Sequence, residues 1–260
     1  MSETLVFLAV LPSILLGTYI YKKDTVEKES TKLLIILLIC GLLATITTFG
    51  ITEIVKIIFP IFDKNALGLD GLSLVVYVLF GIALIEEFSK WIYIYLICWK
   101  HKEFNYAYDA IVYSVFVSLG FATIENILYV DAYNVALFRM ILSVPAHAFF
   151  GVMMGYYLGL AKISYNHKYY EKSKFYKLLS LLIPVFCHFM YDYLIFADKT
   201  FLFYSFVLVL YYYSYRKVKR LSKINRGIFN GEGEIYGKFG SNKVWKNSYI
   251  FSFFMGIFSF

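Results

Sequence analysis

The chain has 260 residues, of which 60% are hydrophobic and 17% are charged, and it carries a formal net charge of +7. Soluble domains contain roughly 45 to 50% apolar and 25% charged residues, so this composition excludes an ordinary soluble enzyme and indicates a protein embedded in the lipid bilayer. Because the basic residues are spread over several loops instead of one recognition element, we expect contact with anionic lipid and no nucleic-acid partner.

Long apolar runs follow one another along the chain, and several reach the roughly 20 residues that a helix needs to cross the hydrocarbon core. We expect membrane-spanning helices near residues 4–21, 33–59, 72–99, 107–130, 136–160, 177–196 and 201–215. Segments that alternate polar and apolar residues, as the strands of a transmembrane barrel do, are absent from the sequence. The predicted fold is an all-α, polytopic transmembrane helical bundle of about seven to eight spans.

One membrane-embedded domain is predicted for residues 1–216, because no internal repeat, phosphate-binding loop or linker-like segment interrupts them. Residues 217–260 are predicted to form a flexible cytoplasmic tail. This tail contains several glycines and ends in an apolar segment, 249–260, that is too short to span a bilayer. We expect the segment to lie on the bilayer surface.

Basic residues accumulate on alternate loops, which predicts the orientation of the bundle. The loops after the first, third and fifth predicted spans and the start of the tail carry most of them: Lys22, Lys23, Lys28, Lys32, Lys100, Lys102, Lys162, Lys168, Lys172, Lys174, Arg216, Lys217, Lys219 and Arg220. Lysine and arginine are enriched in cytoplasmic loops. We therefore expect the N-terminus outside and the tail in the cytoplasm.

Charged and strongly polar residues also occur deep inside four of the predicted spans. Each charge there costs at least about 2.5 kcal/mol on insertion scales, and such residues are functional-site candidates by default. The candidates, grouped by successive span, are Glu86, Glu87 and Lys90, then Glu125 and Asn126, then His147, and finally His188 and Asp192.

Helical spacing predicts how the members of each group are arranged. At about 100° per residue, Lys90 projects between Glu86 and Glu87, so one ammonium can brace both carboxylates. His188 and Asp192 are four residues apart, which lets the carboxylate accept a ring N–H of the imidazole.

Counting about 1.5 Å per residue assigns similar depths, at mid-membrane or in its outer half, to one residue of each group: Glu86, Glu125, His147 and His188. These four can form one site if their helices pack together. Gly151 and Gly155 follow His147 at four and eight residues. We expect them to let a neighbouring helix approach closely.

Four motifs lie on successive predicted spans, in this order: Glu86-Glu87-x-x-Lys90, Phe121-x-x-x-Glu125-Asn126, His147 followed by Gly151, and His188-x-x-x-Asp192. Through these motifs the sequence resembles the PrsW family of membrane proteases. The resemblance covers roughly residues 1–216, including the loop YKKDTVEKE, and matches nothing in the apolar tail. This family is similar in turn to the CAAX prenyl endopeptidases and to bacteriocin-processing membrane proteins.

The resemblance implies an intramembrane endopeptidase in a bacterial plasma membrane, with residues 1–216 as its protease domain. It also implies that the substrate is a single-pass anti-sigma factor, which is cut near the outer side of the membrane. This cut is the first step of a cascade that frees a sigma factor.

Peptide hydrolysis needs a nucleophile, a base and stabilisation of the oxyanion. No serine–histidine, cysteine–histidine or paired-aspartate arrangement offers itself, so water is the expected nucleophile. We expect Glu86 or Glu87, together with one histidine, to activate the water, and His147 or His188 to hold the oxyanion. The remaining candidates are expected to orient these groups, with one amide as a reserve oxyanion donor: Glu125, Asp192 and Asn126.

A metal-dependent version of this chemistry uses the same residues as ligands: His147, His188, Glu125 and Glu87. Two histidines and a glutamate can form a catalytic zinc site, although no HExxH motif is present. Similarity to the CAAX enzymes favours the metal-free version, so no cofactor is the preferred prediction and zinc is the alternative.

Two other classes of function use the same residue types. Buried Glu, His and Asp are also found in proton-coupled transporters and channels, which commonly have repeated halves or discontinuous helices. Neither feature is visible in the sequence. A scaffold that binds a membrane peptide without cutting it is the third possibility.

Overall fold

The computed structural model describes residues 3–24, 26–63, 68–133 and 136–229. In these ranges the regular structure is entirely helical, which confirms the predicted all-α bundle. The elements are α1 (Glu3–Lys23), α2 (Thr31–Ile58), the short turn η1 (Pro60–Asp63), α3 (Gly71–Val76), η3 (Tyr77–Ala83), α4 (Leu84–Cys98), α5 (Asp109–Tyr133), α6 (Ala136–Asn166), α7 (Tyr170–Phe196) and α8 (Thr200–Phe229).

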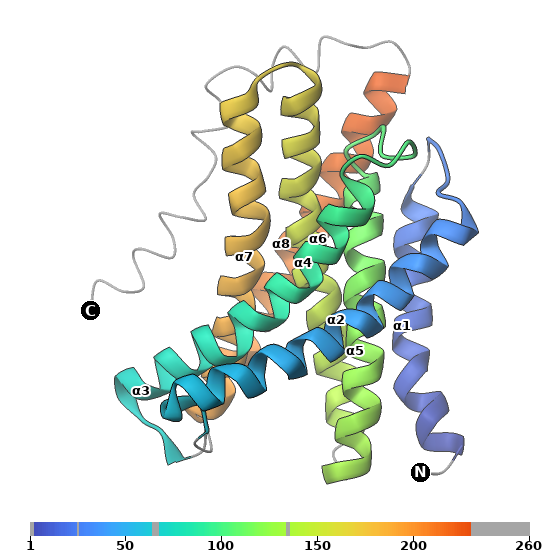
Figure 1. Cartoon of the computed structure of the whole chain (residues 1–260). Coiled ribbons are helices and arrows are strands. Elements are labelled where there is room, and N and C mark those ends of the chain that lie inside the picture. The colour runs from blue at the N-terminus through green and yellow to red at the C-terminus, as the bar shows by residue number, and fades with distance from the viewer. Residues whose placement is uncertain (1–2, 25, 64–67, 134–135, 230–260) are drawn as a thin grey trace.

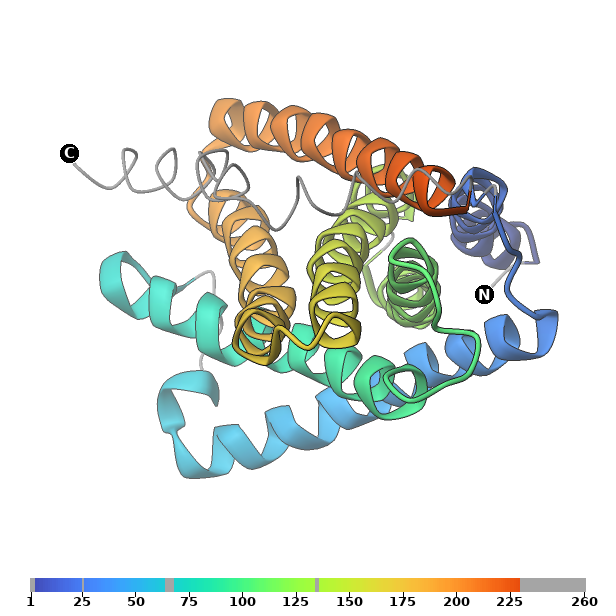
Figure 2. The ribbon, with the colours of Figure 1, turned by 90° about the horizontal axis from the view of Figure 1, so that it is seen from above.

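The helices α5, α6 and α7 form the centre of the bundle, with α6 packed against both of the others. The helix α2 and the continuous helix formed by α3, η3 and α4 run obliquely across them (Figures 1 and 2). The outer helix α1 packs against α5 and α6, and α8 packs against α6 and α7. Every helix that carries a candidate site residue therefore contacts at least two others.

Five helical stretches within the described residues are long and apolar enough to cross a membrane: Thr31–Ile58, Gly71–Cys98, Asp109–Leu128, Leu142–Asn166 and Tyr170–Phe196. They correspond to the second to sixth predicted spans. The helices at the positions of the first and seventh predicted spans, α1 and α8, are not among the five. On α2, Leu37 is wholly buried while Ile39 and Ile46 are 51% and 60% exposed. An outer surface this apolar is suited to lipid contact.

Small residues let α5 approach its neighbours at backbone distance. A Cβ atom added to Gly41 on α2 would fall onto the backbone of Val117, and one added to Gly155 on α6 would fall onto that of Ala110. A Cβ on Gly151 would come within 2.9 Å of the backbone oxygen of Ser114. The close helix approach predicted from Gly151 and Gly155 is confirmed.

The last helix is longer than the predicted span 201–215. It continues to Phe229, past the predicted domain boundary at residue 216. Val218, Leu221 and Ile224 are buried in the main hydrophobic core. Residues 217–225 therefore belong to a helix that packs on the bundle, and the predicted domain division at residue 216 stays a prediction. The apolar segment 249–260 lies outside the described residues.

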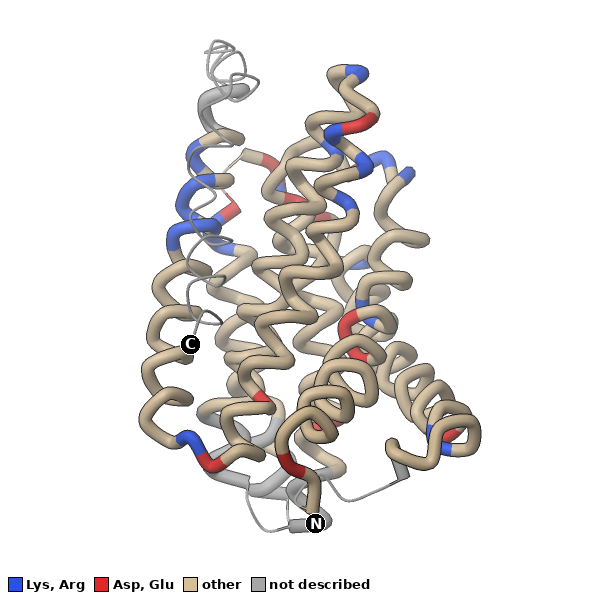
Figure 3. The backbone as a smooth tube through the Cα atoms, turned by 90° about the vertical axis from the view of Figure 1, so that its left-hand side faces the viewer, with Lys and Arg blue, Asp and Glu red and all other residues tan. Residues whose placement is uncertain are grey.

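Lysine and arginine gather toward one end of the molecule (Figure 3). Residues 24 and 26–30, the loops 99–108 and 167–169 and the second half of α8 lie at this end, because the helices alternate in direction. We call it the basic end. Its assignment to the cytoplasm stays a prediction.

Candidate functional site

The candidate residues come from four helices that meet at one place in the bundle. The contributions are Glu86, Glu87 and Lys90 from α4, Glu125 and Asn126 from α5, His147 from α6, and His188 and Asp192 from α7. The π-helical segment η3 directly precedes Leu84, the first residue of α4. Such segments often occur at functional sites, and their wider turn changes the rotation of the helix that follows.

The ammonium of Lys90 lies between two carboxylates of its own helix. Its Nζ donates to Oε1 of Glu87 at 2.7 Å and lies 3.6 Å from Oε2 of Glu86. It also lies 3.0 Å from Nδ1 of His147 and 4.1 Å from the ring centre of Phe121. Glu87 and Lys90 are both wholly buried. The prediction that one ammonium braces both carboxylates is confirmed.

Both ring nitrogens of His188 face carboxylates. Nδ1 lies 2.9 Å from Oε1 of Glu87, and Nε2 lies 3.2 Å from Oδ2 of Asp192, one turn further along α7. The predicted contact between His188 and Asp192 is therefore present. When Nδ1 donates its hydrogen to the buried carboxylate of Glu87, the lone pair of Nε2 faces the centre of the site.

His147 is held from two sides as well. Its Nε2 lies 2.8 Å from Oε2 of Glu125. Because the ammonium of Lys90 can only donate, Nδ1 of His147 accepts from it, and Nε2 carries the hydrogen that Glu125 accepts. The rings of His147 and His188 are nearly perpendicular, with their centroids 5.3 Å apart.

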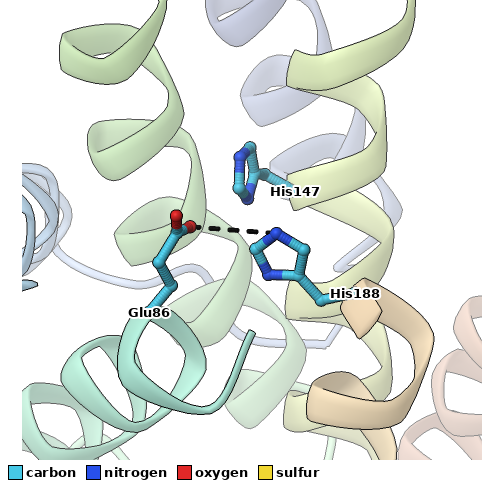
Figure 4. A group of neighbouring side chains, drawn as sticks. All are labelled: Glu86, His147 and His188. Atoms are coloured by element: carbon cyan, nitrogen blue, oxygen red, sulfur yellow. Dashed lines mark ion pairs between the residues drawn. The ribbon is translucent and has the colours of Figure 1, made fainter. Parts of the chain in front are cut away.

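Glu86 is turned toward the two histidines (Figure 4). One ligand atom each from Glu86, His147 and His188 lie within 4.8 Å of one another. Oε2 of Glu86 lies 3.9 Å from Nε2 of His188, and it is a buried oxygen that has no hydrogen-bond partner in the described part of the chain. Two imidazoles and a carboxylate with an unsatisfied oxygen are the donor types of catalytic metal sites, and the Nδ1 lone pair of His147, which accepts from Lys90 here, is the ligand atom that this ring can offer.

The ligand set predicted for the metal-dependent version differs from this grouping. It combined both histidines with Glu87 and Glu125. In the structure Oε1 of Glu87 contacts Lys90 and His188, and Oε2 of Glu125 contacts His147. Glu86 is the carboxylate that groups with both rings.

One aromatic residue at the site was not singled out from the sequence. Phe150 stacks on the ring of His188 with centroids 4.8 Å apart, and its edge-on distance to His147 is 5.8 Å. It is 1% exposed. The available signal was its position three residues after His147, on the same face of α6.

Asn126 is also buried, on α5 beside Glu125. Its use as a reserve oxyanion donor stays a prediction. Glu86, Glu125 and Asp192 have side chains that are 12%, 14% and 20% exposed, respectively. Each of these three carboxylates can therefore be reached from outside the packed core, unlike Glu87.

Residues 29–215 match the model of a family described as "PrsW family intramembrane metalloprotease". Among curated proteins, the chain is 37% identical to Protease PrsW of Geobacillus kaustophilus over 84% of this chain and 92% of the relative. It is 44% identical to Protease PrsW of Halalkalibacterium halodurans over 58% of this chain and 69% of that protein. It is 32% identical to Protease PrsW of Bacillus subtilis over 83% of this chain and 94% of that protein. No solved structure matches the chain significantly.

Proposed function

Because the chain belongs to the PrsW family of intramembrane proteases, we propose that the site between α4, α5, α6 and α7 hydrolyses a peptide bond of a single-pass membrane protein. Family membership makes the chain a membrane peptidase. It therefore favours proteolysis over the two alternatives raised by the sequence, a proton-coupled transporter and a non-cleaving scaffold.

The grouping of Glu86, His147 and His188 within 4.8 Å carries the proposal. We assign these three residues to a catalytic metal ion, which would take the Nδ1 lone pair of His147 in place of the hydrogen bond from Lys90. We assign zinc because two imidazoles and one carboxylate are a donor set typical of catalytic zinc. The sequence favoured a metal-free site. The donor set and the family description, which names a metalloprotease, support the metal-dependent version instead.

The chemistry that such an ion supplies when bound is polarisation of a carbonyl and acidification of a water molecule. Glu87 accepts the Nδ1 hydrogen of His188, which fixes the tautomer and leaves Nε2 as the ligand atom. Lys90 neutralises Glu87 and so allows a carboxylate to remain ionised in an apolar interior.

Glu125 and Asp192 have a second task in this proposal. Each contacts one of the two histidines and is partly exposed. Glu125 orients the ring of His147 by accepting its Nε2 hydrogen, and Asp192 lies beside Nε2 of His188. Their partly exposed carboxylates can accept a proton released by the attacking water. Phe150 covers the two rings and keeps bulk water from them.

We propose that the substrate is an anti-sigma factor, cut in the outer half of the membrane. If the basic end faces the cytoplasm, α7 begins inside at Tyr170 and ends outside at Phe196. His188 is then about 27 Å from the inner end of α7 and about 12 Å from the outer end, counted at 1.5 Å per residue. This position agrees with a cut near the outer side of a single-pass protein.

The test is cleavage of a tagged single-pass anti-sigma factor that is co-reconstituted with the protein in liposomes, together with the metal content measured by mass spectrometry. Wild type is compared with Glu86→Gln and His188→Ala, with and without a strong chelator. The matched controls are Glu53→Gln, an exposed carboxylate on α2, and His167→Ala, an exposed histidine near the turn before α7.

We expect one zinc per chain in wild type and in both controls, and less in both site variants. Cleavage should be lost with chelator and restored by zinc. In the two site variants it should fall at least about 100-fold, because mutation of even the outer-shell partners of metal ligands lowers metal affinity or activity by about 10- to 100-fold. Metal-free protein that cleaves at the wild-type rate would contradict the metal assignment. Unchanged cleavage in both variants would contradict the site, and cleavage of other single-pass proteins but not this one would contradict the substrate.

A further inference from the structure

A second group of buried carboxylates lies at the basic end, away from the site described above. Asp24 directly follows α1, Glu29 lies just before Ser30, the N-cap of α2, and Asp109 is the first residue of α5. One carboxylate oxygen of each lies within 4.8 Å of the others. The three residues are only 2%, 5% and 1% exposed. We call them the acidic trio.

Hydrogen bonds from the protein use one oxygen of each carboxylate. Oδ2 of Asp109 accepts from the backbone N–H groups of Tyr106 at 2.7 Å and Asn105 at 3.0 Å. Oε2 of Glu29 accepts from the hydroxyl of Tyr113 at 2.9 Å. These bonds orient two carboxylates from different elements toward each other and cannot balance their charges.

The carboxylate of Asp24 is the least satisfied of the three. Its Oδ1 accepts a long bond of 3.4 Å from the N–H of Val26. Its Oδ2 is buried and has no hydrogen-bond partner within residues 3–24, 26–63, 68–133 and 136–229. A buried carboxylate oxygen that accepts no bond, in a residue grouped with two other buried carboxylates, is costly unless a cation or a proton is present.

The nearest lysine does not fill this role by direct contact. Nζ of Lys28 donates to the backbone carbonyl groups of Tyr21 and Asp24 and lies over the Tyr21 ring. In the described part of the chain, no lysine or arginine forms an ion pair with a carboxylate of the acidic trio. Burial, with the nearby Asp109 adding to it, raises the pKa of Glu29 to about 9.

We propose that Asp24, Glu29 and Asp109 bind a divalent cation that takes oxygen ligands, of the class of Ca²⁺, Mg²⁺ and Mn²⁺. Carboxylate oxygens without nitrogen or sulfur donors suit these hard cations, in contrast to the imidazole-containing group proposed for zinc. Since the ligands come from the α1–α2 loop and from the start of α5, the cation ties the first helices of the bundle to the helix that carries Glu125. The proposal does not depend on the proposed proteolytic reaction.

The test uses the purified full-length chain in lipid nanodiscs, stripped with chelator and titrated with Mn²⁺, whose binding is followed by electron paramagnetic resonance. The background is His188→Ala, which removes a ligand of the other proposed metal site. We expect one Mn²⁺ per chain, displaced by Ca²⁺ or Mg²⁺, and at least tenfold weaker binding in Asp24→Asn. Glu27→Gln, an exposed carboxylate in the same loop, is the control and should bind like the background protein.

Thermal unfolding provides the second measurement. A cation at 100 times its dissociation constant should raise the Tm of the background protein by about 5 °C or more. The Tm of Asp24→Asn should not respond to the cation, and in chelator it should equal or exceed that of the background protein, because one repelling charge is gone. If Asp24→Asn does not fold, Glu29→Gln replaces it, since glutamine can still accept from Tyr113. Absence of bound Mn²⁺, or equal binding and equal Tm response in the variants, would overturn the proposal.

Discussion

Nδ1 of His188 lies 2.9 Å from Oε1 of Glu87, although the two residues are 101 positions apart in the sequence. The pair joins α7 to α4 in the interior of the bundle, where Glu87 is wholly buried. The same oxygen accepts from Lys90 at 2.7 Å. A single carboxylate oxygen thus orients one imidazole and neutralises one ammonium, so its charge matters for both stability and activity.

Glu87→Gln should lower stability by about 3 to 5 kcal/mol, because it leaves the ammonium of Lys90 buried without its nearest counter-charge. Thermal unfolding in detergent micelles measures the change. The control is Glu53→Gln, which breaks the exposed pair with Lys56 and should cost less than about 1 kcal/mol. Similar losses of stability in both variants would show that the buried charge of Glu87 stabilises the fold no more than an exposed carboxylate does.

Adding Lys90→Met to Glu87→Gln should recover part of that loss, since the double variant buries no unpaired ammonium. The two changes should be non-additive by about 0.5 to 3 kcal/mol in a double-mutant cycle. Cleavage should not return, because His188 still lacks its charged partner. Strictly additive effects would contradict a direct ion pair between the two side chains.

Asp192→Asn should weaken zinc affinity by about 10- to 100-fold while changing stability little, because Asp192 is partly exposed and places a negative charge beside Nε2 of His188, the proposed ligand atom. Competition with a chromophoric chelator measures the affinity. Asp198→Asn, just after α7, is the matched control, and asparagine tolerates its positive φ of 53°. An affinity equal to wild type in Asp192→Asn would refute the supporting role.

Gly155→Ala should destabilise the bundle by about 1 to 3 kcal/mol, because its Cβ would overlap the backbone of Ala110 and force α6 away from α5. Gly50→Ala on α2 meets nothing within 4 Å and should instead be neutral or stabilise by up to about 1 kcal/mol. Unfolding temperatures of the two variants check this difference. Equal behaviour of both would mean that α5 and α6 can separate without cost.

Much of the site could be predicted from the sequence, because helical spacing fixes which side chains share a face. The position of Lys90 between Glu86 and Glu87 and the contact between His188 and Asp192 follow from spacings of three and four residues. Charged residues within apolar runs also indicated which helices contribute to the site, because such residues are costly in a membrane unless they have a partner or a function.

The remaining features depend on packing that periodicity does not encode. Glu86 and Glu87 differ by one position, about 100° around the helix, so which of them groups with both histidines depends on the rotation of α4 after the π-helical segment η3. The acidic trio could not be seen either. Asp24 and Asp109 are separated by 84 intervening residues, and both lie at the ends of helices, where charged residues are ordinary.

The glycine contacts of α5 also bear on how a substrate reaches the histidines. Gly41 and Gly120 bring α2 and α5 together backbone to backbone, and Gly155 does the same for α5 and α6. A transmembrane segment cannot slide from the lipid through either of these two seams unless the main chains part. Lateral entry of the proposed substrate must therefore use another side of the bundle.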